Sequence, residues 1–380
     1  LVSYMRFSYV PAPHSIYKGV KKLLPGHLLC LKSPVSEVDI PKSYWSLEDA
    51  YQIGIRESFQ GSEDEATDEL ELKLKKTVKS RMVSDVPLGA FLSGGIDSST
   101  VVALMQSQID LPVNTFTIGF QEQEFNEAVH AKKVAEYLGT NHTEMYLSPQ
   151  EAMDVIPSLT AMYDEPFADS SQIPTHLISQ LARQHVTVAL SGDGGDELFA
   201  GYNFLVNKPE NELDAEIKRV CSIMHFPTQK IGMELGIKIE SPFLNQKIIE
   251  LASQIPSNLK IKEEGGKRYG KWILRKTFEK HIPLQIAWRR KSPMQEGAGT
   301  SGLTNLFESI ISEEVYVEKK LTVEKNDGVV IRSRESMYYY EIFKKLYGSP
   351  VDDNAECKCP YCKHEVKNSK FCRMCGAFPI

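Results

Sequence analysis

Short apolar runs alternate with amphipathic segments through the middle of the chain. The apolar runs predict buried strands at 86–91, 113–120, 142–146 and 186–190. Between them, apolar residues at helical spacing predict helices from about Asp64 and over 100–108, 126–138 and 149–162. Strands and helices that alternate at this length predict an α/β fold, with a Rossmann-like parallel sheet flanked by helices and ligands at the C-terminal strand ends.

The flanking regions follow other patterns. Residues 1–46 are rich in turn residues and predict an extended segment, and the polar stretch 53–63 predicts a linker. Residues 306–347 have a helical pattern, with aromatic residues at 338–340 that we expect in a core. A further linker is expected over 348–356, before a tail rich in cysteine.

Composition narrows the class of protein. The 380 residues are 42% hydrophobic and 25% charged, which is typical of a soluble globular chain. No uninterrupted apolar window of about 18 residues indicates a membrane span, and the net charge of −6 makes nucleic acid an unlikely partner. We expect a cytoplasmic protein. The chain begins at Leu1 without a signal segment, which is consistent with a fragment whose natural start is missing.

The most informative stretch is Leu92-Ser93-Gly94-Gly95-Ile96-Asp97-Ser98-Ser99, between the first predicted strand and a helix. Glycines let backbone N–H groups approach an anion, serines add hydroxyl donors, and a helix N-terminus attracts negative charge. The stretch therefore predicts a phosphate-binding loop. It lacks the lysine and the spacing of the usual P-loop motif, and a simple tight turn is the alternative.

A second turn of small residues follows the strand at 186–190. Here three carboxylates, including Asp193 and Asp196, are interleaved with serine and glycine. Carboxylates beside an anion site are reasonable where a hard cation lies between them, because Mg²⁺ prefers oxygen ligands and bridges phosphates. We therefore expect Asp97 and Asp196 to hold Mg²⁺.

The tail carries two C-x-x-C motifs. Four thiolates in two such pairs are typical of a structural Zn²⁺ site, so we expect a zinc ribbon held by Cys359, Cys362, Cys372 and Cys375. A segment this short buries too little apolar surface to fold without the metal. Cys357 and His364 are substitute ligands, and disulfides are the alternative. The ribbon carries several basic residues, and its partner is not readable from the sequence.

Several motifs in one order resemble a known family. LSGGIDSS, YDEPFADSSQIPT, LSGDGGDELFAGY, ESPFLN, KWILR and AWRRK are similar to the synthetase domain of glutamine-dependent asparagine synthetases, over roughly residues 1–305. The resemblance implies an ATP-pyrophosphatase domain of the adenine nucleotide alpha hydrolase-like fold at 56–347. It also implies a remnant of the glutaminase domain and a linker at 1–55, with a linker and the zinc ribbon left at 348–380.

The resemblance also implies the chemistry. Aspartate attacks the α-phosphorus of ATP to form β-aspartyl-AMP and pyrophosphate, and ammonia from glutamine then displaces AMP to give asparagine. Pyrophosphate would lie against the loop, on Ser93, Gly94, Gly95, Ser98 and Ser99. Lys271 would stabilise the charge that develops, and Asp193 would help to deprotonate ammonia. Adenosine would contact Leu92, Ile118 and Gly192.

The chain departs from this family in places that leave alternatives open. No cysteine stands at the N-terminus, so the glutaminase function must come from a domain upstream or in trans. Ser241 and Asn245 replace the arginine and aspartate usual in the family, which leaves amide formation on another carboxylate possible. A pyrophosphate-loop enzyme that modifies tRNA and an inactive zinc-ribbon adaptor are further alternatives. The basic run 289–291 could equally be solvated.

Overall fold

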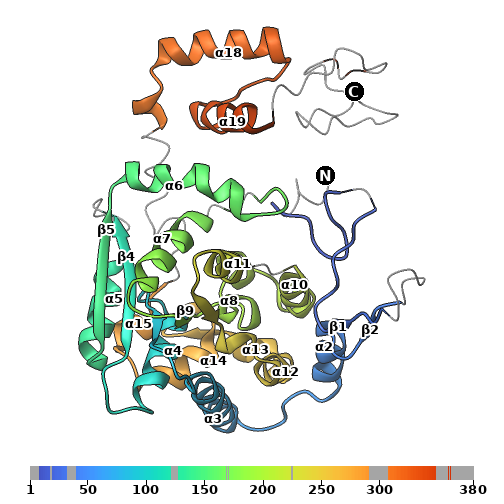
Figure 1. The fold of residues 1–380 in the computed structure, drawn as a ribbon. Coiled ribbons are helices and arrows are strands. Elements are labelled where there is room, and N and C mark those ends of the chain that lie inside the picture. Colours follow the sequence, from blue (N-terminus) through green and yellow to red (C-terminus); the bar gives the residue numbers. More distant parts are fainter. Residues whose placement is uncertain are drawn as a thin grey trace.

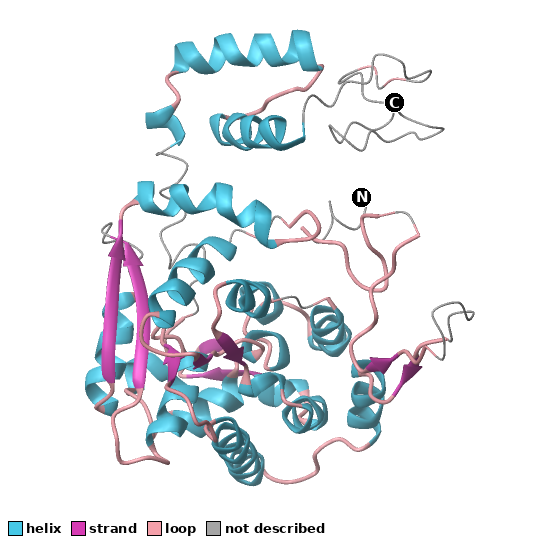
Figure 2. Ribbon diagram, viewed as in Figure 1, coloured by secondary structure: helices cyan, strands magenta, loops and turns pink. Residues whose placement is uncertain are grey.

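A computed structural model describes residues 8–17, 19–31, 40–120, 127–167, 169, 171–223, 226–290, 307–347, 358 and 360. Figure 1 gives the course of the chain, and Figure 2 shows a parallel sheet surrounded by helices. The helical pair α18 (Glu313–Asp327) and α19 (Arg334–Tyr347) lies beyond α6 (Pro149–Met162), at one end of the molecule.

The central sheet has five parallel strands in the order β5-β4-β3-β6-β7. Their bounds are β3 (Leu88–Phe91), β4 (Asn114–Phe120), β5 (Asn141–Leu147), β6 (Val188–Leu190) and β7 (Lys238–Glu240). Gly89 lies in register with Asn114 on one side and with Ala189 on the other. The first strand of this sheet, β3, is therefore central, and the chain builds the sheet outward from it in both directions.

Side chains of the central strands alternate between two hydrophobic cores, as the two-residue period of a strand requires. Ala90 packs in the core formed with α3 (Glu63–Arg81), α4 (Ile96–Gln106), α5 (Ala128–Leu138) and α14 (Trp272–Phe278). Phe91 packs in the core formed with α6 and α7 (Gln172–Arg183) on the other face. Both faces of the sheet are covered, which is why the central strand β3 is mostly buried and apolar, whereas the edge strands β5 and β7 carry polar residues.

The remaining elements surround these layers. They are β1 (His27–Leu28), β2 (Lys42–Ser43), α2 (Leu47–Arg56), α8 (Gly195–Leu198), α9 (Asn203–Val206), α10 (Glu210–Ser222), α11 (Pro227–Glu234), the 3-10 helix η2 (Pro242–Leu244), α12 (Gln246–Gln254), α13 (Ser257–Lys260), β8 (Ile261–Glu264), β9 (Lys267–Gly270) and α15 (Leu284–Ala287).

Three sequence predictions need correction. The helix predicted over 100–108 begins at Ile96, because Gly95 caps it in extended conformation and Asp97 is favourable in a first turn. The predicted linker 53–63 begins inside α2, where Gly54 lies against the backbone of Ser253 in α12. The helical pattern of 306–347 divides into α18 and α19, because α18 ends at a left-handed Gly328.

Within the ranges described above, no helix is long and apolar enough to cross a membrane. The domain boundaries proposed from the sequence stay predictions, although α2 packs closely on α12 across the boundary at 55.

Candidate active site

The loops that follow β3 and β6 meet at the C-terminal edge of the sheet. From β3 the chain goes on to β4 on one side, and from β6 it goes on to β7 on the other side. This change of direction between neighbouring strands is the arrangement that opens a ligand crevice in doubly wound sheets. A cavity of about 600 Å³ lies there, and both loops line it. The cavity is large enough for a ligand of nucleotide size.

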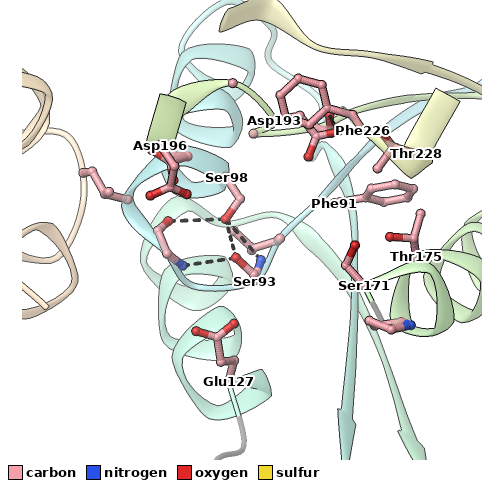
Figure 3. A pocket seen from close by; sticks show the side chains of 18 of the residues that line it. Phe91, Ser93, Ser98, Glu127, Ser171, Thr175, Asp193, Asp196, Phe226 and Thr228 are labelled. Carbon is pink, nitrogen blue, oxygen red and sulfur yellow. Dashed lines mark hydrogen bonds between the residues drawn. The ribbon is translucent and has the colours of Figure 1, made fainter. Parts of the chain in front are cut away.

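Serine hydroxyls hold the first loop in shape. The Ser93 and Ser98 hydroxyl oxygens are 3.0 Å apart, and the Ser93 backbone N–H donates to Ser98 Oγ at 3.2 Å. Gly94 has a left-handed φ of +70° and lies against α5, where an added Cβ would come within 2.5 Å of the Ala131 nitrogen. Figure 3 shows Ser93 and Ser98 facing each other at the start of α4. These contacts fix the shape of the loop without any ligand.

The second loop approaches the first because it carries glycine. A Cβ on Gly192 would lie 2.7 Å from the Ser98 nitrogen, and one on Gly195 would lie 2.4 Å from Asp97 Oδ1. Larger residues at either position would separate the loops. The two glycines therefore bring the carboxylates of the second loop beside the anion cradle of the first.

Lys271 joins the two loops. Its side chain is 2% exposed, and its ammonium group pairs with Asp97 Oδ2 and, at 2.7 Å, with Asp196 Oδ1. Burial alone would lower the pKa of Lys271, but the carboxylates of Asp196 and Asp97 outweigh that effect and hold the pKa above its usual value. Lys271 is charged at neutral pH, and its backbone has a left-handed φ of 57° at the cap of α14.

The charges of this trio suit a divalent cation. Two carboxylates and one ammonium leave one net negative charge beside the N-terminus of α4. This negative charge would repel a polyphosphate. Carboxylate oxygens converging from two loops are the ligands that Mg²⁺ prefers, and a divalent ion would reverse the sign of the local charge. The residues present therefore fit a magnesium ion held by Asp97 and Asp196.

Asp193 lies in the cavity wall with its carboxylate held by hydroxyls. Its Oδ2 accepts hydrogen bonds from Thr228 Oγ1 at 2.6 Å and from Ser191 Oγ at 3.1 Å. Burial raises the pKa of Asp193, and these hydrogen bonds lower it. The carboxylates of Asp97 and Asp196 raise it again, so the net pKa of Asp193 lies above its usual value.

The structure brings most of the predicted site residues together. Those that line the cavity are Leu92, Ser93, Gly95, Asp97, Ser98, Ile118, Gly192, Asp193, Asp196 and Lys271. Gly94 and Ser99 are outside the lining, because Gly94 faces α5 and Ser99 is wholly buried in α4. The four cysteines predicted to bind Zn²⁺ lie outside the described residues. Among the residues that are described, no group of three or more His, Cys, Asp or Glu side chains could hold a metal ion.

Other residues of the cavity were missed by the sequence analysis. Glu127, at the start of α5, pairs with Arg289 at 2.6 Å, so Arg289 is a cavity residue and not part of a solvated basic run. Thr228 lies on α11 in a stretch without a motif, and no signal in one sequence marks it. Ser171 stands in YDEPFADSSQIPT, where the motif could have indicated it.

Fold and site together define a doubly wound α/β protein with a serine-glycine loop, an acidic pair and a buried lysine at its switch point. The family model for asparagine synthase matches residues 69–225 and 215–365. The chain belongs to the asparagine synthase family.

Relatives agree with this assignment. Asparagine synthetase [glutamine-hydrolyzing] 1 of Bacillus subtilis is 34% identical over 272 residues, which are 70% of this chain and 40% of that protein. A relative from Methanocaldococcus jannaschii is 41% identical over 200 residues, covering 52% of this chain and 37% of its own length. The chain therefore spans about two fifths of the length of these relatives.

A weaker likeness links the chain to a solved structure. NMN synthetase from Francisella tularensis is 14% identical with a TM-score of 0.35, over 78% of this chain and 100% of that chain. A likeness this weak implies nothing about activity.

Proposed function

We propose that this chain carries the synthetase reaction of its family: ATP-dependent amidation of aspartate, through β-aspartyl-AMP, with release of pyrophosphate and AMP. One observation carries the proposal. Lys271 lies between Asp97 and Asp196 in the wall of the cavity where the serine-glycine loop opens. This arrangement places donors for phosphate oxygens next to ligands for the counter-cation.

The chain's own residues would divide the work. Backbone N–H groups and hydroxyls of the loop at Ser93 and Ser98 bind the departing pyrophosphate. Lys271 stabilises the negative charge that develops at the α-phosphate, and its burial strengthens that interaction because little water screens it. The apolar wall around Leu92 and Ile118 receives the adenine ring.

Mg²⁺, held by Asp97 and Asp196, would neutralise pyrophosphate as it leaves and so make it a better leaving group. The ammonia is proposed to come from glutamine, through a glutaminase domain upstream or in trans. Zn²⁺ in the cysteine tail is proposed as a structural ion, away from this chemistry.

The test is pyrophosphate release from ATP and Mg²⁺ with ammonium as the nitrogen source. We expect release that depends on aspartate and gives asparagine in equal amount. Asp97→Asn should lower this release about a hundredfold, because the carboxylate is lost at constant size. Asp110→Asn is the matched control, because Asp110 is exposed beyond the end of α4, and we expect it to leave the rate unchanged.

Two other results would redirect the assignment. If pyrophosphate is released only with a different carboxylate, the site performs amide formation on another acceptor, as the departures at Ser241 and Asn245 allow. If pyrophosphate release instead depends on tRNA, the chain is assigned as a tRNA-modifying enzyme and not as a synthetase. If no acceptor supports pyrophosphate release, the chain is assigned as an inactive member of the family.

A further inference from the structure

Three hydroxyl side chains form a chain that ends on Asp193. Ser241 Oγ lies 2.9 Å from Ser191 Oγ, and Ser191 and Thr228 both contact the same carboxylate oxygen, Asp193 Oδ2. Ser241 is 4% exposed and Ser191 is 3% exposed. Figure 3 shows Asp193 and Thr228 side by side at the cavity. These residues come from three separate segments, the loop after β6, the start of η2, and α11.

The direction of these hydrogen bonds follows from the ionised carboxylate. A carboxylate only accepts, so Thr228 and Ser191 each donate their single hydroxyl proton to Asp193. Ser191 then has no proton left for Ser241, and Ser241 must donate to Ser191. Because both bonds end on Oδ2, they restrain the rotation of the carboxylate and do not occupy Oδ1.

Charged groups on the neighbouring elements either act on Asp193 or are paired with one another. Lys271, at the cap of α14, is paired with Asp97 and Asp196. Asp97 on α4 and Asp196 on α8 raise its pKa. On α11, Lys230 is paired with Asp164 and Glu234. On β7, Glu240 is paired with Arg81 and Lys238. The hydroxyls of Thr228 and Ser191 are the groups that lower the pKa of Asp193.

We propose that Thr228, Ser191 and Ser241 are positioning residues that aim Asp193 at the attacking nitrogen and tune it as the base of the amide-forming step. The inference rests on the proposed function. In that step the nitrogen lone pair of ammonia forms a bond to the acyl carbon of the adenylate. Asp193 takes one N–H proton, the bond from carbon to the phosphate oxygen breaks, and AMP leaves with that electron pair. The products are the amide, AMP and protonated Asp193.

Ser241 completes the hydroxyl chain at a buried position. Its hydroxyl adds a hydrogen bond to the network without adding a charge beside Asp193.

The experiment compares Thr228→Val, Thr228→Ser and Ser241→Ala by the pH dependence of asparagine formation. The burst of pyrophosphate in the first turnover is measured beside it, because this burst reports adenylate formation alone. Valine removes a bond that favours the ionised carboxylate, so the pKa of Asp193 should rise. The acid limb of kcat/KM for ammonium should then move to higher pH by about one unit. Ammonium itself titrates identically in every variant. Differences between the variants in the pH of the acid limb therefore come from groups of the protein.

The other variants separate positioning from packing. Thr228→Ser keeps the hydroxyl, so its acid limb should lie at the same pH as in the wild-type protein. Ser241→Ala acts through Ser191 and should shift the limb in the same direction by less. Thr187→Val is the matched control, because the Thr187 hydroxyl is buried with no hydrogen-bond partner among the described residues and precedes β6, at the far end of that strand. It should cause no shift.

Three results would overturn the proposal. The first is an acid limb that stays in place in Thr228→Val. The second is a first-turnover burst of pyrophosphate that slows as much as asparagine formation does, because the hydroxyls would then serve the earlier step. The third is a change confined to the KM of aspartate. A wild-type protein without aspartate-dependent pyrophosphate release would overturn the proposed function together with this one.

Discussion

Gly201 lies where no side chain fits, between the carboxylate of Asp196 and the stem of Lys271. A Cβ at this position would be 2.0 Å from Asp196 Oδ1 and 2.0 Å from Lys271 Cε. The Gly201 N–H also donates to the Asp196 carbonyl at 2.8 Å, so the backbone cannot move away without losing that bond. The ion pair of the site therefore depends on a residue that takes no part in the chemistry.

Gly201→Ala should lower the free energy of unfolding by about 1–3 kcal/mol, the usual range for overpacking. Activity should fall further, because the methyl group separates Lys271 from Asp196. Thermal unfolding and pyrophosphate release measure the two effects. Gly61→Ala is the control, since its Cβ would meet only the ends of the Phe59 and Glu65 side chains, which can move. Equal activity in both variants would show that the contact around Gly201 is unimportant.

At the scale of elements, Arg275 connects α14 to the segment after α15. Its guanidinium donates to the carbonyls of Gly270 at 2.9 Å, Ala287 at 2.5 Å and Arg289 at 2.9 Å. The side chain is buried, so these carbonyls have little access to water. Arg275 thereby fixes the backbone that carries Arg289 to the cavity and to Glu127.

Arg275→Lys should lower the free energy of unfolding by about 3 kcal/mol, because a lysine cannot reach three separate carbonyls with one ammonium group. The KM for ATP should rise as Arg289 loses its fixed position. Urea unfolding and steady-state kinetics are the measurements. Arg183→Lys, at the exposed end of α7, should change neither quantity. A normal KM in a destabilised Arg275→Lys would separate stability from nucleotide binding.

The strands β3 to β6 and the helices α3 to α6 were predictable from sequence because their signals are local. For example, Ser148 caps α6 and Pro149 lies in its first turn. The edge strand β7 was not predicted, because its three residues make no apolar run. The start of α4 was missed because its first turn contains Ser98 and Ser99, and serine is also common in loops. The pairing of Arg289 with Glu127, and of Thr228 with Asp193, joins residues distant in the chain, which one sequence does not indicate.

At the scale of the whole molecule, the cysteine tail is predicted to be a separate metal-dependent unit. The full-length protein should contain about one zinc ion per chain, measured by elemental analysis. Cys372→Ser should remove most of it, because three thiolates hold the ion less tightly. Pyrophosphate release should be retained, since every cavity residue lies between Phe91 and Arg290. Cys30→Ser, at an exposed free cysteine, is the control. Zinc retained in Cys372→Ser would contradict the ligand set.

The strand order has a consequence for how the protein acquires its site. Leu88 of the central strand pairs with Val188, and Lys271 meets Asp97 across 174 residues of sequence. Such long loops close slowly, because their entropy must be lost before the contacts form. A chain still emerging from the ribosome would have its serine-glycine loop long before its lysine. Nucleotide affinity should thus arise late in folding, and a bound nucleotide would mark chains that have completed the sheet.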